Sequence, residues 1–136
     1  MASEVSSKVV LTTKDYLAEA KIRDHYSVLD RPVEKGGGDA GPTPVEYLLT
    51  AIAGCVSMTL RIYLERKDWN VGNITVEVFQ KEKLTQNGIE KSIVEHISFE
   101  NEISEDKKAQ LLKVAAKCPV AKMIKGETKV TSHIVS

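Results

Sequence analysis

The sequence predicts an α+β protein in which an antiparallel sheet packs against one long helix. Two observations carry this prediction. Apolar residues recur at helical spacing over 44–66, and they alternate with polar residues over 73–101 in the pattern of a β-hairpin. The chain has 136 residues, which is the size of one domain, so we expect a single domain over 1–136.

The N-terminal third is expected to form short strands followed by a glycine-rich loop. Residues 6–30 alternate imperfectly between apolar and polar side chains, around a polar turn at 12–15. Residues 31–44, RPVEKGGGDAGPTP, then contain four glycines and three prolines. Such a composition is typical of a loop, because strands cannot use it and helices cannot enter it.

The long helix is predicted to begin at Pro44. Thr43 suits the N-cap, where its hydroxyl can accept a free N–H of the first turn, and Pro44 suits the first helical position, where no N–H is needed. The first four turns are apolar almost all round, and beyond the first turn charge appears only near the end. A helix of this kind is usually central in a fold and covered on several sides.

The second half of the chain is expected to form a hairpin, two helices and a last strand. In the hairpin over 73–101, Asn87-Gly88 favours the turn. Ser104 is the expected N-cap of the next helix, and Pro119 begins a short helix after it. Residues 128–136 alternate as a strand.

Composition argues against several classes of partner. Nineteen basic and nineteen acidic residues cancel, and aromatic residues make up 5% of the chain, so we expect no nucleic acid and no membrane surface as partner. Without a signal-peptide pattern or an uninterrupted apolar run of about 18 residues, a cytoplasmic location is expected. No CxxC motif occurs and the three histidines are scattered, so we expect no metal site.

The chain has two cysteines, Cys55 in the long helix and Cys118 before Pro119. Taken alone, Cys55 reads as a small apolar side chain of the core, because free cysteine is among the most buried residue types. Cys118 precedes a helix start, where unpaired N–H groups favour a thiolate. In a reducing cytoplasm a permanent disulfide between them is not expected.

The segments GPTPVEYLLTAIAGC, at 41–55, and KCPVAKMI, at 117–124, together resemble the OsmC/Ohr family of thiol-dependent peroxidases, and most closely its OsmC-like branch. The resemblance covers nearly the whole chain. It implies an OsmC-like fold in which two copies form an intertwined homodimer, the long helices pack centrally, and both protomers build each active site.

The resemblance also implies a chemistry for the two thiols. Cys55 would be the peroxidatic cysteine, which attacks organic hydroperoxides, and hydrogen peroxide as a further substrate, and becomes a sulfenic acid. Cys118 would be the resolving cysteine, which condenses with that sulfenic acid to a disulfide. A small dithiol or a lipoyl group would then reduce the disulfide by exchange, with no cofactor in the protein.

In the family, an arginine paired with a glutamate activates the peroxidatic thiol. Arg31 occupies roughly the place of that arginine, with Arg23 in reserve, and an ordinary surface role is the alternative for both. The family's glutamate usually follows the helix-start proline directly. That position is Val45 here and the carboxylate is Glu46, for which dipole stabilisation in the first turn is the alternative.

Two other functions stay open at this stage. The valine at position 45 favours a non-catalytic relative, in which the same dimer is a binding or structural module with two buried thiols. A thiol hydrolase would need a histidine base beside Cys55. No motif ties His25, His96 or His133 to Cys55, so this second alternative has little support.

Overall fold

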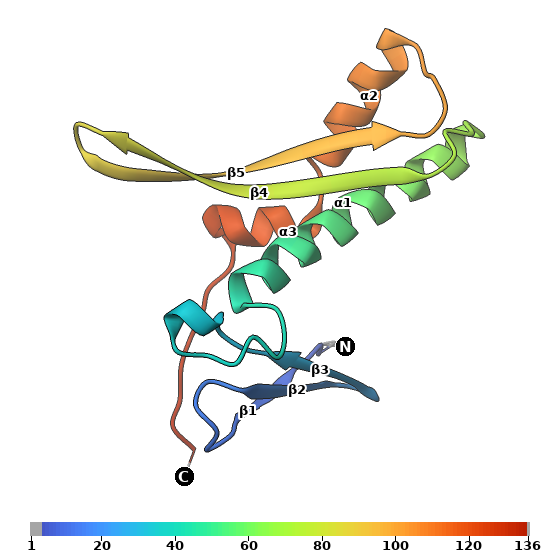
Figure 1. Cartoon of the computed structure of the whole chain (residues 1–136). Helices are drawn as coiled ribbons and strands as arrows, with labels where there is room; N and C mark the ends of the chain where they lie inside the picture. The colour runs from blue at the N-terminus through green and yellow to red at the C-terminus, as the bar shows by residue number, and fades with distance from the viewer. Residues whose placement is uncertain (1–3, 136) are drawn as a thin grey trace. The chain divides into compact units, whose positions relative to one another are not determined.

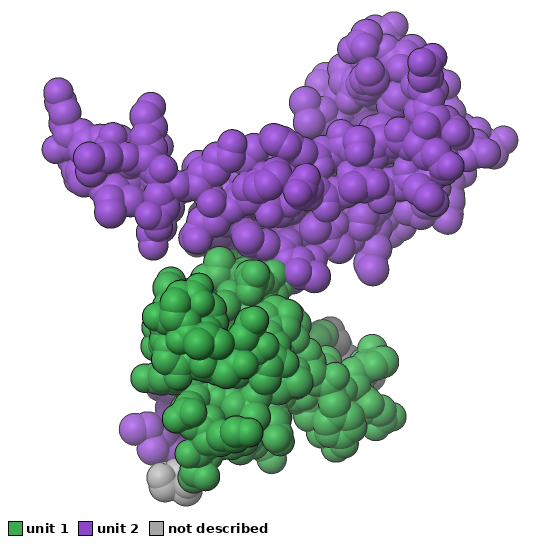
Figure 2. Space-filling view, in the orientation of Figure 1, with its two compact units in different colours: residues 1–48 green, residues 49–136 purple. Residues whose placement is uncertain are grey.

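The computed structural model describes residues 4–135 (Figure 1). The chain forms two compact units that divide between Leu48 and Leu49 (Figure 2). The α+β class and the antiparallel pairing are both confirmed, but the strands form two sheets, one in each unit. The assignment of 1–136 to a single domain stays a prediction.

The first unit contains a three-stranded antiparallel sheet in the order β1-β2-β3. Its strands lie where the alternating pattern predicts them, at Lys8–Leu11, Ala18–Ile22 and His25–Leu29. The Thr12 backbone N–H and hydroxyl both donate to the Leu17 carbonyl, at 3.1 and 3.0 Å, and close the turn between β1 and β2. After β3 comes a short 3-10 helix, η1, at Val33–Lys35, inside the glycine-rich segment.

The long helix α1 runs from Pro44 to Lys67, one residue beyond its predicted end. Its first turn is fixed to β3 by Tyr47, whose hydroxyl donates to the Val28 carbonyl at 2.8 Å. Every fourth residue along one side of the helix is buried: Ile52, Val56, Leu60 and Leu64. This spacing gives α1 one core-facing stripe.

The hairpin of the second unit consists of β4, Ile74–Thr85, and β5, Gly88–Phe99. Pairing runs from Ile74 opposite Phe99 to Thr85 opposite Gly88. The turn therefore falls on Gln86 and Asn87, one residue earlier than Asn87-Gly88. Gly88 has φ 112°, a backbone conformation that favours glycine, and it begins the returning strand instead of lying inside the turn.

Two helices follow the hairpin as predicted. α2 spans Glu105–Ala115, with the Ser104 hydroxyl accepting the Lys107 N–H at 3.3 Å. α3 spans Pro119–Lys122 and continues as a π-helix, η2, at Met123–Glu127.

The predicted last strand over 128–136 is wrong for the part that the structure describes. Residues 128–135 have no regular secondary structure, and Ser136 lies outside the described residues. Val130 and Ile134, which gave the segment its alternating pattern, are both exposed. Alternating apolar and polar residues form a half-buried strand only where another strand pairs with them. In the described residues, neither sheet includes this segment.

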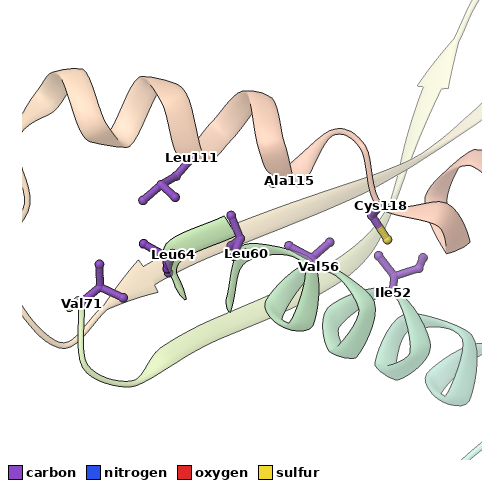
Figure 3. Packing of buried hydrophobic residues seen from close by; sticks show 8 residues of the cluster. All are labelled: Ile52, Val56, Leu60, Leu64, Val71, Leu111, Ala115 and Cys118. Carbon is purple, nitrogen blue, oxygen red and sulfur yellow. The ribbon is translucent and has the colours of Figure 1, made fainter. Parts of the chain in front are cut away.

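The core of the second unit is shared by α1, α2 and the hairpin (Figure 3). The buried stripe of α1 faces Leu111 and Ala115 of α2, with Val71 at one end and Cys118 at the other. Alternate residues of the hairpin pack against this cluster: Ile74, Val76, Val78, Ile97 and Phe99. The packing fixes α2, and the segment after it, against the middle of α1.

The opposite side of α1 carries apolar side chains that the described residues leave exposed. Met58 is 69% exposed and Ile62 is 54% exposed. By length and composition alone α1 could cross a membrane, since its most apolar window has mean hydropathy 1.5 despite its polar residues, and 22% of that window is buried. One such helix is weak evidence for a membrane span, because core helices of soluble proteins have the same properties.

Replacing Leu60 by alanine should destabilise the fold by about 2–5 kcal/mol, because a fully buried leucine leaves a cavity in this shared core. Leu84→Ala, at the exposed tip of the hairpin, is the matched control and should change stability by no more than about 0.5 kcal/mol. Urea unfolding followed by circular dichroism measures both. Equal effects of the two substitutions would contradict the assignment of the core.

Candidate functional site

The structure brings the two cysteines together in the second unit. Cys55 lies on α1 and is half-buried, whereas Cys118 lies between α2 and α3 and is 0% exposed. Figure 3 shows the Cys118 side chain directed toward α1, where Ile52 and Val56 lie. Both thiols are free, and a hydrogen bond joins them.

The surroundings of Cys118 favour its neutral thiol. Burial is the main reason that the pKa of Cys118 lies above its ordinary value of 9.0, and the hydrogen bond with Cys55 raises the pKa further. The backbone N–H groups of Ala121 and Val120, at the start of α3, lower the pKa, as expected for a helix start. They do not outweigh burial, so the expected preference for a thiolate at Cys118 is wrong.

Cys55 has a second polar neighbour on its own helix. Thr59 lies one turn further along α1, and its hydroxyl oxygen is 4.0 Å from the Cys55 Sγ, within hydrogen-bonding range for sulfur. The rest of the Cys55 side chain packs against the apolar core cluster. The only exposed route to the thiol pair in the described structure is therefore through Cys55, because Cys118 has no exposed surface.

A pocket of about 730 Å³ opens next to residues that contact Cys118, although neither cysteine lines it. Its apolar wall includes Ile52 from α1, Ala115 from the end of α2 and Ala121 from α3. Two of these residues hydrogen-bond Cys118 directly: the Cys118 N–H donates to the Ala115 carbonyl, and the Ala121 N–H donates to the Cys118 thiol. Lys91 and Lys125 also line the pocket.

Arg31 lies in the first unit, in a loop built around the carboxylate of Asp30. Asp30 is 3% exposed and accepts three backbone N–H groups, from Arg31 at 2.7 Å, Ala40 at 3.0 Å and Gly38 at 3.2 Å. The bond from Ala40, followed by that from Arg31, holds the pKa of Asp30 below its ordinary value of 3.8. One charged side chain thus joins both ends of the glycine-rich segment.

Close backbone contacts explain two of the glycines in this loop. A Cβ at Gly37 would lie 2.0 Å from the Arg31 carbonyl oxygen, and one at Gly41 would lie 2.4 Å from that of Val28. Any side chain at these positions would force the loop apart. The guanidinium of Arg31 stacks on Tyr16, 4.8 Å from the ring centroid. Arg31 is therefore part of an ordered loop.

Arg23, the reserve candidate, lies in the tight turn between β2 and β3 with φ 53°. Its guanidinium is exposed and lies 3.4 Å from the His25 ring. Arg31 and Arg23 both belong to the first unit and the cysteines to the second, so the role of either arginine beside Cys55 stays a prediction.

Glu46 forms a capping box at the start of α1. Its carboxylate accepts the Thr43 N–H at 2.8 Å, and the Thr43 hydroxyl accepts the Glu46 N–H at 3.2 Å. Thr43 is thus the N-cap, as predicted. These bonds agree with the alternative role of Glu46, in which its carboxylate stabilises the first turn of the helix. A part for Glu46 in activating Cys55 stays a prediction.

Sequence reasoning missed Asp30 and the polar role of Thr59. Asp30 directly precedes Arg31 and a run of glycines, and an acid at that point could have been recognised as a loop organiser. Thr59 falls at the helical spacing of the apolar residues Ile52 and Val56, so the pattern alone gives it no polar role. Its spacing of four residues from Cys55 was the available signal, because residues four apart meet on a helix surface.

Comparison with known proteins identifies the family. The family model described as OsmC-like protein matches residues 36–133. The chain belongs to this family. The comparison with curated proteins found no match.

Solved OsmC-like structures share the fold. An OsmC-like protein from Mycoplasma pneumoniae has a TM-score of 0.70 at 20% identity, covering 93% of this chain and 91% of that one. An organic hydroperoxide resistance protein OsmC from Legionella pneumophila has a TM-score of 0.68 at 16% identity, covering 93% and 92%. The organic hydroperoxide resistance protein OhrB of Bacillus subtilis has a TM-score of 0.63 at 14% identity, covering 92% and 93%. These similarities confirm the OsmC-like fold.

Asp30→Asn should loosen the Arg31 loop at neutral pH, because an amide cannot accept three N–H groups as the carboxylate does. The Gly38 and Ala40 amides should then exchange with solvent faster, as measured by NMR. The folded pKa of Asp30 is lowered, so its stabilisation is complete above pH 3.8 and is lost as pH falls through that folded pKa. As the pH falls through this range, the free energy of unfolding of the wild type should approach that of Asp30→Asn.

Glu34→Gln, which removes an exposed negative charge from the same segment, controls for net charge in this comparison. It should leave both amides protected. Unchanged exchange at Gly38 and Ala40 in Asp30→Asn would show that the carboxylate does not hold the loop.

Proposed function

We propose that this OsmC-like protein is a cytoplasmic thiol-dependent peroxidase that reduces organic hydroperoxides, and hydrogen peroxide as a further substrate. The observation that carries the proposal is the hydrogen-bonded pair of free cysteines, of which one is half-buried and the other fully buried. Membership of the OsmC-like family and the fold shared with organic hydroperoxide resistance proteins support it.

The reaction has three balanced steps. The Cys55 thiolate attacks the distal oxygen of the hydroperoxide, a sulfur–oxygen bond forms, the O–O bond breaks, and the alkoxide leaves as an alcohol after taking up a proton. Cys55 is thereby oxidised to a sulfenic acid. The Cys118 thiol condenses with it, forming a disulfide and releasing water. A small dithiol or lipoyl group then reduces the disulfide and is itself oxidised to a disulfide.

Burial supports this division of roles between the thiols. A peroxide can approach Cys55, which is half-buried, whereas Cys118 has no exposed surface. Cys118 is also kept neutral by burial and by its hydrogen bond, which raise its pKa, so it is poorly suited to make the first attack. Its contact with Cys55 suits the second step, in which it needs to reach only that residue.

The pocket next to the neighbours of Cys118 supports an organic substrate. A volume of about 730 Å³ with a largely apolar wall, next to residues that contact Cys118, can hold the hydrocarbon part of a hydroperoxide. Water and hydrogen peroxide gain little from an apolar wall, so the pocket favours organic hydroperoxides over hydrogen peroxide.

Activation of Cys55 is assigned to Arg31, with Glu46 as its acidic partner. The ordered loop around Asp30 supports Arg31 over Arg23, because a guanidinium held in one place loses less entropy when it meets a thiolate. The engagement of Glu46 in the capping box makes it the weaker of the two assignments.

The active unit is proposed to be a homodimer packed through α1. Ala51, Cys55, Met58 and Ile62 follow one another at alternating spacings of four and three residues, the pattern of a helix–helix seam. Met58 and Ile62 are exposed, although such side chains are usually covered. A second copy of the helix would cover them and border Cys55, in agreement with the shared active sites that the resemblance implies.

A non-catalytic dimer is the second candidate. It is favoured by the valine at position 45, which stands where the family usually has glutamate, and by the capping role of Glu46. In such a protein the two thiols would serve only packing.

One equivalent of cumene hydroperoxide should convert the reduced protein to a Cys55–Cys118 disulfide, detected by peptide mass spectrometry. Cys55→Ser should lower peroxide consumption by roughly 10³-fold or more, because it removes the nucleophile. Cys118→Ser should consume about one equivalent and stop at a Cys55 sulfenic acid that dimedone traps. Two thiols that stay free after peroxide treatment would favour the non-catalytic dimer.

Introducing a charge into the α1 seam should dissociate the dimer. Met58→Glu should shift the protein from dimer to monomer in sedimentation velocity, because a buried, unpaired carboxylate opposes association. Leu84→Glu places the same charge at the exposed hairpin tip and should leave the dimer intact. A wild-type protein that sediments as a monomer would rule out the seam.

A further inference from the structure

We propose that Thr59 is a catalytic residue whose hydroxyl donates a hydrogen bond to the Cys55 Sγ and stabilises the thiolate that attacks the substrate. The inference rests on the proposed peroxidase function, and it assigns a donor that lies on the same helix as the nucleophile. The observation behind it is the 4.0 Å separation between the Thr59 Oγ1 and the Cys55 Sγ.

The helix itself fixes this geometry. Thr59 follows Cys55 by one turn of α1, so their side chains lie one above the other on the same face. Both residues are half-buried, and threonine has few side-chain conformations available in a helix because it is β-branched. The hydroxyl is therefore held near the sulfur with little loss of side-chain entropy.

The apolar surroundings of Cys55 create the need for such a donor. Its side chain packs against the core cluster, and a thiolate in apolar surroundings is destabilised unless hydrogen bonds reach it. The Cys118 thiol is one donor, and it stays neutral because burial and the bond to Cys55 raise its pKa. Thr59 supplies a second donor, so a single chain offers the thiolate two hydrogen bonds.

A neighbouring hydroxyl shows that this arrangement is specific to Thr59. Ser57 lies between Cys55 and Thr59 in sequence and is also half-buried. Its hydroxyl donates to the Gly54 carbonyl at 2.8 Å, so that hydroxyl is committed to the backbone of the helix. Ser57 therefore offers a matched control in which a hydroxyl is removed from the same turn of α1 without touching the sulfur contact.

The test measures the thiolate directly, without relying on peroxide turnover. The rate of Cys55 alkylation by iodoacetamide is followed across pH by peptide mass spectrometry, which separates it from buried Cys118. Thr59→Val keeps the shape and removes the hydroxyl, so alkylation at neutral pH should fall roughly tenfold and its pH midpoint should rise. Thr59→Ser keeps a hydroxyl and should stay within about twofold of wild type.

Ser57→Ala should leave the alkylation profile of Cys55 unchanged. Circular dichroism checks that each variant is folded, and Thr59→Ala takes the place of Thr59→Val if valine disturbs the helix. A Cys55 profile in folded Thr59→Val that matches wild type at every pH would overturn the inference. The inference would also be overturned if Ser57→Ala shifted the pH midpoint of Cys55 alkylation as much as Thr59→Val does. Such a result would mean that the shift comes from a general change in the helix and not from loss of the Thr59 hydroxyl.

Peroxide turnover separates the two proposals. If Cys55 thiolate attack limits the rate, kcat/KM for cumene hydroperoxide should fall in Thr59→Val by the same factor as alkylation. A wild-type protein that alkylates readily but does not consume peroxide would contradict the peroxidase, while the alkylation profiles would still decide the role of Thr59.

Discussion

The buried stripe of α1 is the constraint on which the thiol site depends. Packing of Leu60 and its neighbours against α2 sets where the chain after α2 can run, and this places Cys118 in the core cluster against which Cys55 packs. The two cysteines are far apart in sequence, and no local signal brings them together. Loss of that packing would therefore separate the thiols before it affected either of them chemically.

Local signals predicted most of the fold, because each acts within a few residues. The N-caps at Thr43 and Ser104 and the alternation in the hairpin needed no knowledge of distant parts of the chain. The last strand was not predictable in the same way, since alternation at 128–135 identifies a strand only if a partner strand is present. The neutral state of Cys118 likewise depends on burial by elements that the sequence places far away.

The candidate site was predicted only in part, because some of its contacts also join residues that no local pattern connects. The family motif located both cysteines, but it did not indicate the polar contacts of Asp30 in its loop or of Thr59 on α1. Asp30 acts through backbone N–H groups on the far side of a loop, and Thr59 reads as an apolar-stripe residue until its distance to the Cys55 sulfur is known. Hydrogen-bond partners of this kind follow from three-dimensional placement, which residue spacing indicates only within one helix.

The contact between Cys55 and Cys118 also couples redox chemistry to the free energy of unfolding. The disulfide proposed for the catalytic cycle would tie the middle of α1 to the segment after α2 and close a loop that contains the entire hairpin. Loops of that length raise stability by about 4 kcal/mol in the chain-entropy description of cross-links. Each turnover would then pass through a stiffer, more protease-resistant protein, and reduction by a dithiol would return it to a looser one.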